Sequence, residues 1–391
     1  MNEEELVYFD CAATTPLDAR VLEAMAPYWT TAFGNAASPH ALGRRASAAV
    51  EHARGELALA LGADPREIVF TSGATEANNL ALKGVAAAPA HARAPRRIIT
   101  AVTEHHAVLD PLAGLAQSGF EIVRLGVDSD GHINLIELER ELARGALLVS
   151  LMSANNETGV LHPLAQIGAL CRANGALFHT DATQSFGKSP IEVDALGVDL
   201  CRSLPIRRTD QRGRGALSAP QAAAGARRRA NGGRRARGRP PLGDAQRPGD
   251  RRARRGGRLG SAAGPLELAR VAQLRDRFEA ALSARVAGVT RNGDPAARLP
   301  GHANVSFAGC DGESLLRRMP ALCASTAAAC TSASRQPSHV LRAMGLAPER
   351  VLGSVRFSLG LSSTEREVAL ALEWLVHAVG LERAQGPTAS C

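Results

Sequence analysis

The sequence has few lysines, few aromatic residues, no paired cysteine motif and no long apolar run. Only Lys83 and Lys188 accompany 44 arginines in the 391 residues, a bias that indicates a GC-rich coding sequence rather than a basic surface selected for charge. Seven scattered cysteines without a CxxC pair argue against a disulfide framework and against a zinc or other metal site. No stretch reaches the roughly 18 apolar residues of a membrane span, and the acidic start "MNEEELVYFD" is unlike a signal peptide. We therefore expect a cytoplasmic protein that does not bind a membrane.

The positive charge of the chain is confined to one passage. Residues 202–258 hold 18 arginines and three aspartates, a net charge of +15, so the formal charge of +8 leaves −7 for all other residues. The passage has no aromatic residue on which bases could stack, which argues against nucleic-acid binding. Its Arg, Gly, Ala and Pro cannot bury enough apolar surface to offset the entropy of ordering, so we expect 202–258 to be disordered.

Elsewhere, apolar runs alternate with amphipathic helical stretches. Runs typical of buried strands lie in four segments: 66–73, 98–102, 145–159 and 176–187. The alternation predicts an α/β fold with a mostly parallel sheet and helices on both faces. Polar residues follow these strands, and ligands bind at the carboxyl ends of the strands in open α/β sheets. This layout predicts a site at that edge, with the candidates His105, Asn156, Asp181 and Gln184.

Some of these candidates have a structural alternative. In "TSGATEANN" the free N–H groups of a helix start favour a phosphate, with Thr75 as hydroxyl donor, but Ser72 to Thr75 could equally cap the helix. His105 is also compatible with a buried structural histidine, and Asn156 with an ordinary turn. Asp181 is more informative, because an unpaired buried carboxylate costs several kcal/mol and requires a cation. A protonated ring nitrogen is one such cation.

Eight ordered motifs resemble those of the cysteine desulfurases that supply sulfur for iron–sulfur clusters. They are "FDCAATTPLD", "GNAASPHALGRRA", "FTSGATEANNLALKG", "TEHHAVLDP", "NNETGVLHP", "HTDATQSFGK", "ACTSASRQPSHVLRAMGL" and "VRFSLGLSSTERE". The resemblance covers residues 7–200 and 260–380. It implies a PLP-dependent aminotransferase of fold type I, with a large, mostly parallel sheet domain and a smaller α+β domain, pyridoxal 5′-phosphate (PLP) as cofactor, and a homodimer. The implied division is 15–260 for the large domain, and 1–14 with 261–391 for the small one.

The resemblance also assigns roles to single residues. Ala74 and Thr75 resemble the residues that bind the cofactor phosphate, and His105 the catalytic imidazole stacked on the ring. Asp181 resembles the carboxylate that keeps the pyridine nitrogen protonated, so that the ring can accept electrons. Asn156 and Gln184 resemble the partners of the ring oxygen, and Asn156 also lies at the substrate.

The substrate implied by the resemblance is L-cysteine. Cys330, in the small-residue run "CASTAAACTSASRQP", resembles the catalytic cysteine, whose thiolate takes the substrate sulfur and leaves alanine and a persulfide. Arg356 would hold the substrate carboxylate with its planar guanidinium. The persulfide would then serve an iron–sulfur scaffold or another sulfur-acceptor protein. Farther along, Thr364 and Glu367 predict a capping box that opens a helix.

The passage that begins at residue 202 departs from the family pattern. After "DALGVDL" the family continues with a serine, a histidine and the lysine that binds PLP covalently, whereas this chain has no lysine beyond Lys188. Read from the last base of each codon, 201–207 permits Ser-Phe-Ser-Ala-His-Lys. Read from the second base, 231–254 permits a further family motif. We interpret 202–258 as a frameshifted passage between compensating insertions or deletions.

Three alternatives to a working desulfurase remain. One is a related PLP lyase that acts on selenocysteine or cysteine sulfinate, although the "ACTSAS" segment favours the desulfurase. A second is a non-catalytic remnant, because the written chain lacks the lysine that binds PLP. The third, a nucleic-acid binder that uses the arginine-rich passage, is the least favoured.

Overall fold

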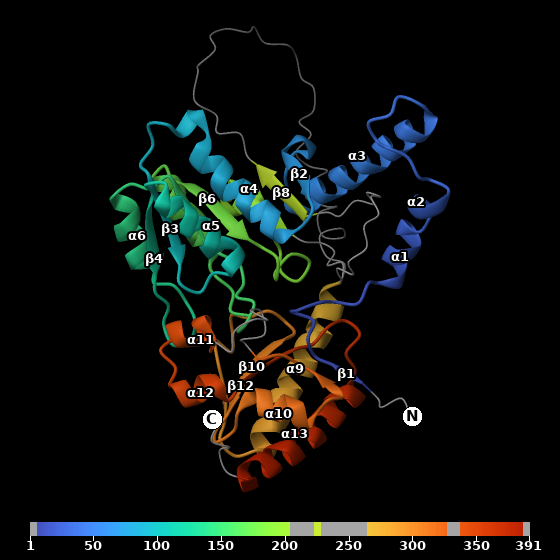
Figure 1. The fold of residues 1–391 in the computed structure, drawn as a ribbon, viewed down its shortest axis with the longest axis vertical. Coiled ribbons are helices and arrows are strands. Elements are labelled where there is room, and N and C mark those ends of the chain that lie inside the picture. The colour runs from blue at the N-terminus through green and yellow to red at the C-terminus, as the bar shows by residue number, and fades with distance from the viewer. Residues whose placement is uncertain (1–5, 204–222, 228–263, 327–336, 386–391) are drawn as a thin grey trace, which may run out of the picture.

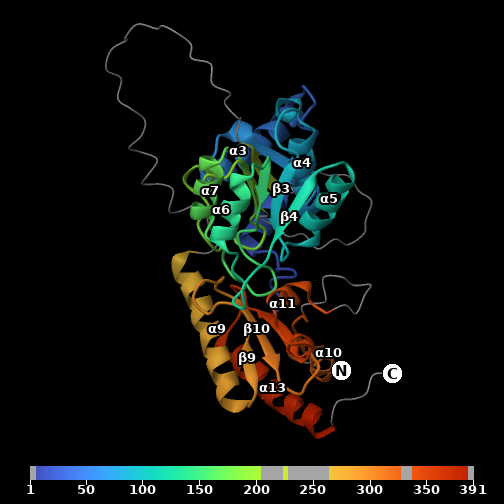
Figure 2. The same cartoon turned by 90° about the vertical axis from the view of Figure 1, so that its left-hand side faces the viewer.

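The computed structural model describes residues 6–203, 223–227, 264–326 and 337–385. In Figures 1 and 2 these residues form two lobes stacked along the long axis. The upper lobe contains the residues from α1 to β8, and the lower lobe contains β1 and the residues from α9 onward. The domain boundaries after residues 14 and 260 stay a prediction.

A seven-stranded sheet forms the centre of the upper lobe. Its strands lie in the order β2-β8-β7-β6-β5-β3-β4. Strand β8 runs antiparallel to both of its neighbours, and the remaining pairs are parallel. The predicted α/β fold with a mostly parallel sheet is confirmed. The strands are β2 (Ile68–Thr71), β3 (Arg97–Ala101), β4 (Glu121–Leu125), β5 (Leu148–Ser150), β6 (Leu177–Asp181), β7 (Leu200–Ser203) and β8 (Ala223–Arg227).

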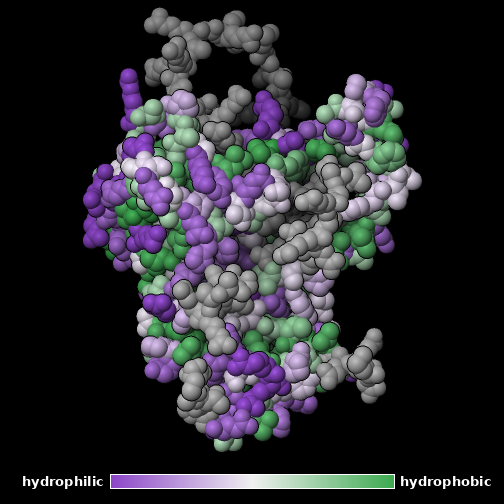
Figure 3. Space-filling view, viewed as in Figure 1, coloured by the Kyte–Doolittle hydropathy of each residue, from purple (hydrophilic) through white to green (hydrophobic). Residues whose placement is uncertain are grey.

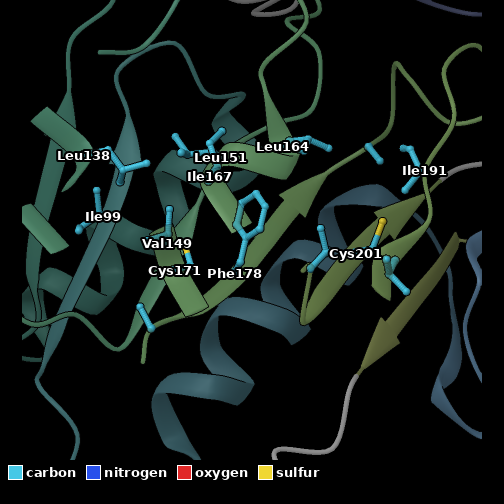
Figure 4. Close-up of a cluster of buried hydrophobic side chains, with 14 of the residues drawn as sticks. Ile99, Leu138, Val149, Leu151, Leu164, Ile167, Cys171, Phe178, Ile191 and Cys201 are labelled. Carbon is cyan, nitrogen blue, oxygen red and sulfur yellow. The ribbon is translucent and has the colours of Figure 1, made fainter. Parts of the chain in front are cut away.

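Helices connect these strands and cover both faces of the sheet. On one face, the apolar sides of α6 and α7 pack against Val149, Phe178 and their neighbours, and Figure 4 shows this cluster. A second cluster on the other face includes Leu82, Ile98 and Leu112, from α4, β3 and α5. The helices are α1 (Ala19–Met25), α2 (Pro27–Thr30), α3 (Ala41–Leu61), α4 (Ala74–Ala87), α5 (His106–Gln117), α6 (Leu135–Ala143), α7 (Leu164–Ala173) and α8 (Val193–Leu196), with 3-10 turns η1 (Pro65–Glu67) and η2 (Pro89–His91).

The lower lobe is built on a three-stranded antiparallel sheet of order β12-β10-β9. The N-terminal strand β1 pairs with β11, which brings the start of the chain into this lobe. The core lies between the sheet and the two long helices α9 and α13, where Phe278 packs edge-on against Phe9 and Phe357. The elements are β1 (Val7–Tyr8), α9 (Pro265–Arg285), β9 (Val289–Arg291), β10 (His302–Phe307), α10 (Gly312–Arg318), β11 (Leu322–Cys323), α11 (His339–Ala343), α12 (Pro348–Leu352), β12 (Ser354–Ser358) and α13 (Glu365–Gln385).

The predicted capping box is present at the start of α13. The N–H of Thr364 donates to Glu367 Oε2 over 2.7 Å, and the N–H of Glu367 donates back to Thr364 Oγ1 over 3.2 Å. The apolar face of this helix is buried, including Val368, Leu372, Leu375 and Val379. The sequence pattern therefore located the start of this helix.

Two short pieces of the arginine-rich passage differ from the expectation that it does not pack. Arg202 and Ser203 complete β7, and residues 223–227 form β8 in the same sheet. The rest of the frameshifted passage that we infer, and Cys330, lie outside the described residues. Within the described ranges, no helix is long and apolar enough to cross a bilayer, and no three metal-ligating side chains cluster.

Candidate functional site

The carboxyl ends of the parallel strands face the lower lobe. Three hydrogen bonds show this, each joining a loop that follows a strand to the lower lobe. After β3, the carbonyl of Glu104 bonds His339 Nε2 over 3.0 Å. After β5, the carbonyl of Asn156 accepts a hydrogen bond from Arg356 Nη1 over 3.1 Å. After β6, Gln184 Nε2 donates to the carbonyl of Ala12 over 3.1 Å. The predicted site residues therefore lie where the lobes meet.

Asp181 ends β6 and is buried with four hydrogen-bond donors around its carboxylate. Oδ2 accepts from Asn78 Nδ2 over 2.9 Å and from Arg202 Nη1. Oδ1 accepts from the N–H of Thr183 over 3.0 Å and from the Thr183 hydroxyl. Because a carboxylate offers about four acceptor positions, this one is fully used by the protein.

The charge of Asp181 is stabilised by its surroundings. Burial alone would raise its pKa, but the guanidinium of Arg202 and the hydrogen bonds from Thr183 and Asn78 together lower the pKa to about 2. The side chains of Arg202 and Asp181 are 4% and 6% exposed, so the two charges form a buried ion pair. A cation is therefore present beside Asp181, as the sequence required, but it comes from the chain itself.

The start of α4 lies one helical turn from this carboxylate. Ala74 and Thr75 form the first turn of the helix, and Thr75 is exposed. Asn78, on the next turn, is buried and holds Asp181. Glu76 folds back to accept the hydroxyl of Ser72 and, over 2.6 Å, the N–H of Ser72, and these two bonds, the hydroxyl bond first, lower the pKa of Glu76. The candidate phosphate contact at Thr75 and the Asn78 side chain that holds Asp181 thus lie on one helix.

His105 is held at the start of α5. It is the N-cap of that helix, and its Nδ1 accepts the N–H of Ala107 over 3.0 Å. This bond makes Nδ1 the unprotonated ring nitrogen of the neutral form. The neighbouring Glu104 is fully buried, and burial raises its pKa well above the ordinary value despite a bond from the N–H of Met152. The backbone N–H of Ala107 thus helps to orient the His105 ring.

Arg356 occupies the centre of β12 in the lower lobe. Its side chain is 2% exposed, and its Nη2 donates to Asp10 Oδ1 over 2.8 Å. Its Nη1 reaches the carbonyl of Asn156 from the upper lobe, whereas Nε has no hydrogen-bond partner in the described part of the chain. A buried guanidinium with spare donors can take a carboxylate.

The structure thus brings the predicted residues to one junction, with one exception. The loops and helix ends that carry Ala74, Thr75, His105, Asn156, Asp181 and Gln184 lie at the strand ends, and Arg356 reaches the same junction from below. Cys330 is the exception, because it lies outside the described residues.

Three residues of this junction were not predicted. Asn78 holds Asp181, and Asp10 holds Arg356. Both Asn78 and Asp10 lie within the quoted motifs. A search for polar residues one helical turn after Ala74 could have found Asn78. Arg202 was not predicted because we expected the whole passage 202–258 to be disordered. The register of the sheet sets it opposite Asp181, and composition carries no signal of that register.

Comparisons with known proteins agree with this geometry. A model described as aminotransferase class-V matches residues 7–203. The chain is 43% identical over 385 residues to the cysteine desulfurase IscS of Anaeromyxobacter sp. (strain Fw109-5), which covers 97% of this chain and 94% of that protein. It is 40% identical over 396 residues to the cysteine desulfurase IscS of Rickettsia bellii (strain OSU 85-389), with 97% and 93% covered. A solved NifS-like protein superimposes with a TM-score of 0.76 at 29% identity, covering 96% of this chain and all of that one.

The fold and the junction define a class-V aminotransferase, a class of PLP enzymes. Within this class, the chain belongs to the cysteine desulfurases.

The residues present meet only part of what PLP requires. The helix start at Thr75 and the imidazole of His105 suit its phosphate and ring. Two features do not fit. Arg202 already neutralises Asp181, and the chain's two lysines lie elsewhere, Lys83 exposed on α4 and Lys188 beyond β6. This chain therefore offers a binding surface for the PLP ring, but the carboxylate of Asp181 on that surface is already paired with Arg202.

Proposed function

We propose that this chain is a cysteine desulfurase that requires the in-frame sequence at 202–258 for turnover. The overall reaction is L-cysteine plus the Cys330 thiol giving L-alanine plus a Cys330 persulfide. The S–S bond forms as the substrate C–S bond breaks, and the carbon keeps the electron pair and takes a proton. Atoms and electrons balance without an external oxidant, and PLP, when bound, supplies the electron sink.

The observation that carries this proposal is the buried Arg356 at the junction of the lobes. Its guanidinium has one partner in each lobe, Asn156 above and Asp10 below, and an Nε without a described partner. Such a group binds the carboxylate of an amino acid in a fixed orientation. The thiol group of a cysteine held there can then be presented to Cys330. The proposed roles of Ala74, Thr75, His105, Asn156, Asp181 and Gln184 are those that the family resemblance assigns.

The missing lysine supports a separate proposal for the chain as written. The class-V match ends at Ser203, the second residue of the arginine-rich passage, which supports a change of reading frame at this point. A form without the covalent lysine is a non-catalytic remnant, whereas the in-frame form is the enzyme. This division explains why the sheet and the junction are intact although a central residue is absent.

The proposed partners are a second copy of this chain, and an iron–sulfur scaffold or another sulfur acceptor. Support for a dimer comes from residues 17–33, where Leu17, Leu22, Trp29 and Phe33 are large, apolar and 43–55% exposed. Helices α1 and α2 in this segment bury no residue in the single chain, and Figure 3 shows hydrophobic groups on this arm at the upper right. Exposed apolar patches of this kind mark interfaces. A cytoplasmic location remains part of the proposal.

The test restores the family reading frame at 202–258 and adds L-cysteine with PLP. We expect alanine and persulfide sulfur in equal amounts. Cys330→Ala should abolish both products and leave the bound-cofactor spectrum unchanged, and Cys323→Ala is the matched control that keeps turnover. Loss of activity in Cys323→Ala, with activity retained in Cys330→Ala, would assign the reaction to the other thiol.

A further inference from the structure

The ion pair between Arg202 and Asp181 is fixed by the backbone rather than by a chance rotamer. Asp181 in β6 pairs in parallel register with Arg202 in β7, and the N–H of Ala182 donates to the carbonyl of Arg202 over 2.8 Å. Paired residues of neighbouring strands project to the same face of a sheet. Any side chain at position 202 therefore faces the carboxylate of Asp181.

The environment of Arg202 is poorly matched to a guanidinium. Only Nη1 reaches Asp181, and Nε is buried without a hydrogen-bond partner in the described residues. A bidentate pair would be the usual arrangement for a buried arginine and carboxylate. Burial lowers the pKa of Arg202 below its ordinary value, although the charge of Asp181 and the hydrogen bond to it act in the opposite direction. The guanidinium therefore uses only part of its hydrogen-bonding capacity at this carboxylate.

We infer that Arg202 occupies, in this chain, the electrostatic position that the protonated ring nitrogen of PLP would take against Asp181. All four acceptor positions of the carboxylate are used, by Asn78, Thr183 and Arg202. A ring N–H can reach Asp181 only by displacing one of these donors. The in-frame residues Ser-Phe-Ser-Ala-His-Lys include no arginine, so position 202 then carries no positive charge and leaves the carboxylate open. The affinity of this chain for PLP therefore does not depend on the ring nitrogen of the cofactor. This inference rests on the proposed PLP site.

The test measures binding rather than turnover. Two compounds are compared by equilibrium dialysis: PLP, and its analogue in which CH replaces the ring nitrogen. The unmodified chain should bind both with dissociation constants within about twofold of each other. Arg202→Ser should bind PLP about tenfold to a hundredfold more tightly than the analogue, because one charge-assisted hydrogen bond becomes available. Asp181→Asn added to Arg202→Ser should erase that preference.

Arg97→Ser is the matched control. Arg97 is also a buried arginine on the central sheet, paired with Glu121 over 3.0 Å and with Glu141. It lies at the amino end of β3, whereas the junction lies at the carboxyl ends of the parallel strands. Its substitution removes a buried charge pair without changing the ratio of the two dissociation constants. A changed ratio in this control would mean that loosening of the fold, not the cation at 202, controls the ring-nitrogen contact, and would overturn the inference.

The outcomes separate this inference from the proposed function. A clear preference of the unmodified chain for PLP over the analogue overturns the inference alone, and this measurement needs no variant to fold. An Arg202→Ser protein that treats both compounds equally also overturns it. Binding of neither compound to any form overturns the cofactor assignment, and the inference with it.

Discussion

Arg356 Nη2 lies 2.8 Å from Asp10 Oδ1, a contact between residues separated by 346 positions in the sequence. Asp10 also accepts the hydroxyl of Ser325 over 2.8 Å, just before residues 327–336. One carboxylate thus ties the start of the chain to β12 and to the segment that leads toward Cys330. The same contact neutralises a guanidinium that is almost fully buried.

Replacing Asp10 by Asn is expected to destabilise the protein. The amide keeps its shape and an acceptor oxygen but leaves the charge of Arg356 uncompensated, which costs about 2–4 kcal/mol in the free energy of unfolding. Urea unfolding measures the effect. Glu365→Gln is the control, because the Arg277–Glu365 pair is exposed on both sides and should contribute little. Equal, small effects of both substitutions would contradict the structural role of Asp10.

The chain as written should not form a covalent PLP chromophore. Its two lysines, Lys83 and Lys188, lie outside the position at which the family carries its cofactor lysine. Purified protein mixed with PLP should lose the visible absorbance of lysine-bound cofactor on gel filtration. Borohydride reduction followed by peptide mass analysis checks this result. A stable adduct at Lys83 or Lys188 would show that another amine had taken over the role.

Glu157 should make the stability of the protein depend on pH. Its carboxyl group is buried and accepts the hydroxyl of Ser338, the N-cap of α11. Burial raises its pKa to about 7, against opposing effects of the Ser338 bond and the charge of Arg356. The folded state therefore holds the proton more tightly than the unfolded state. Its contribution is fully present below about pH 4.5 and is lost as the pH rises to about 7.

Glu157→Gln isolates this contribution. The free energy of unfolding of the natural chain should fall relative to that of the variant by about 3 kcal/mol between pH 4.5 and pH 7.5. Urea titrations at both values give the difference, with Glu365→Gln as an exposed control that should show no such change. A constant difference between Glu157→Gln and the natural chain across this range would mean that Glu157 titrates normally.

Local patterns in the sequence were sufficient to predict the architecture. Alternating apolar runs located β3, β5 and β6, and the spacing of Thr364 and Glu367 located the start of α13. These features depend on residues a few positions apart, so the sequence contains them directly. The same applies to the helix start at Thr75.

The partners of the site residues could not be predicted in the same way. Asp181 meets Arg202 only because β6 and β7 adopt one particular register, and Arg356 meets Asp10 across almost the whole chain. Such contacts follow from packing, not from local propensity. The arginine-rich composition of 202–258 also favoured a disordered segment, and this interpretation concealed that its first residue is buried.

In the form with the restored reading frame, Asp181→Asn should slow the reaction far more than it weakens cofactor binding. The restored residues Ser-Phe-Ser-Ala-His-Lys include no arginine, so the carboxylate of Asp181 is open to the ring nitrogen. The asparagine keeps the shape of the side chain and one acceptor oxygen, which can serve Thr183 or Asn78 but not both, and it removes that charge. Loss of one charge-assisted contact in a water-poor site costs about 2–4 kcal/mol, or roughly 30-fold to 1000-fold in rate.

PLP occupancy should fall much less, because the helix start at Thr75 and the imidazole of His105 still bind the phosphate and ring. The measurement is alanine formation alongside bound PLP for both forms. Asp199→Asn is the matched control, since Asp199 accepts the N–H of Phe178 over 2.9 Å near the start of the same strand, away from the junction. It should keep turnover. Full turnover in Asp181→Asn would show that this carboxylate does not face the ring nitrogen, and that the site assigned from the family motif is wrong.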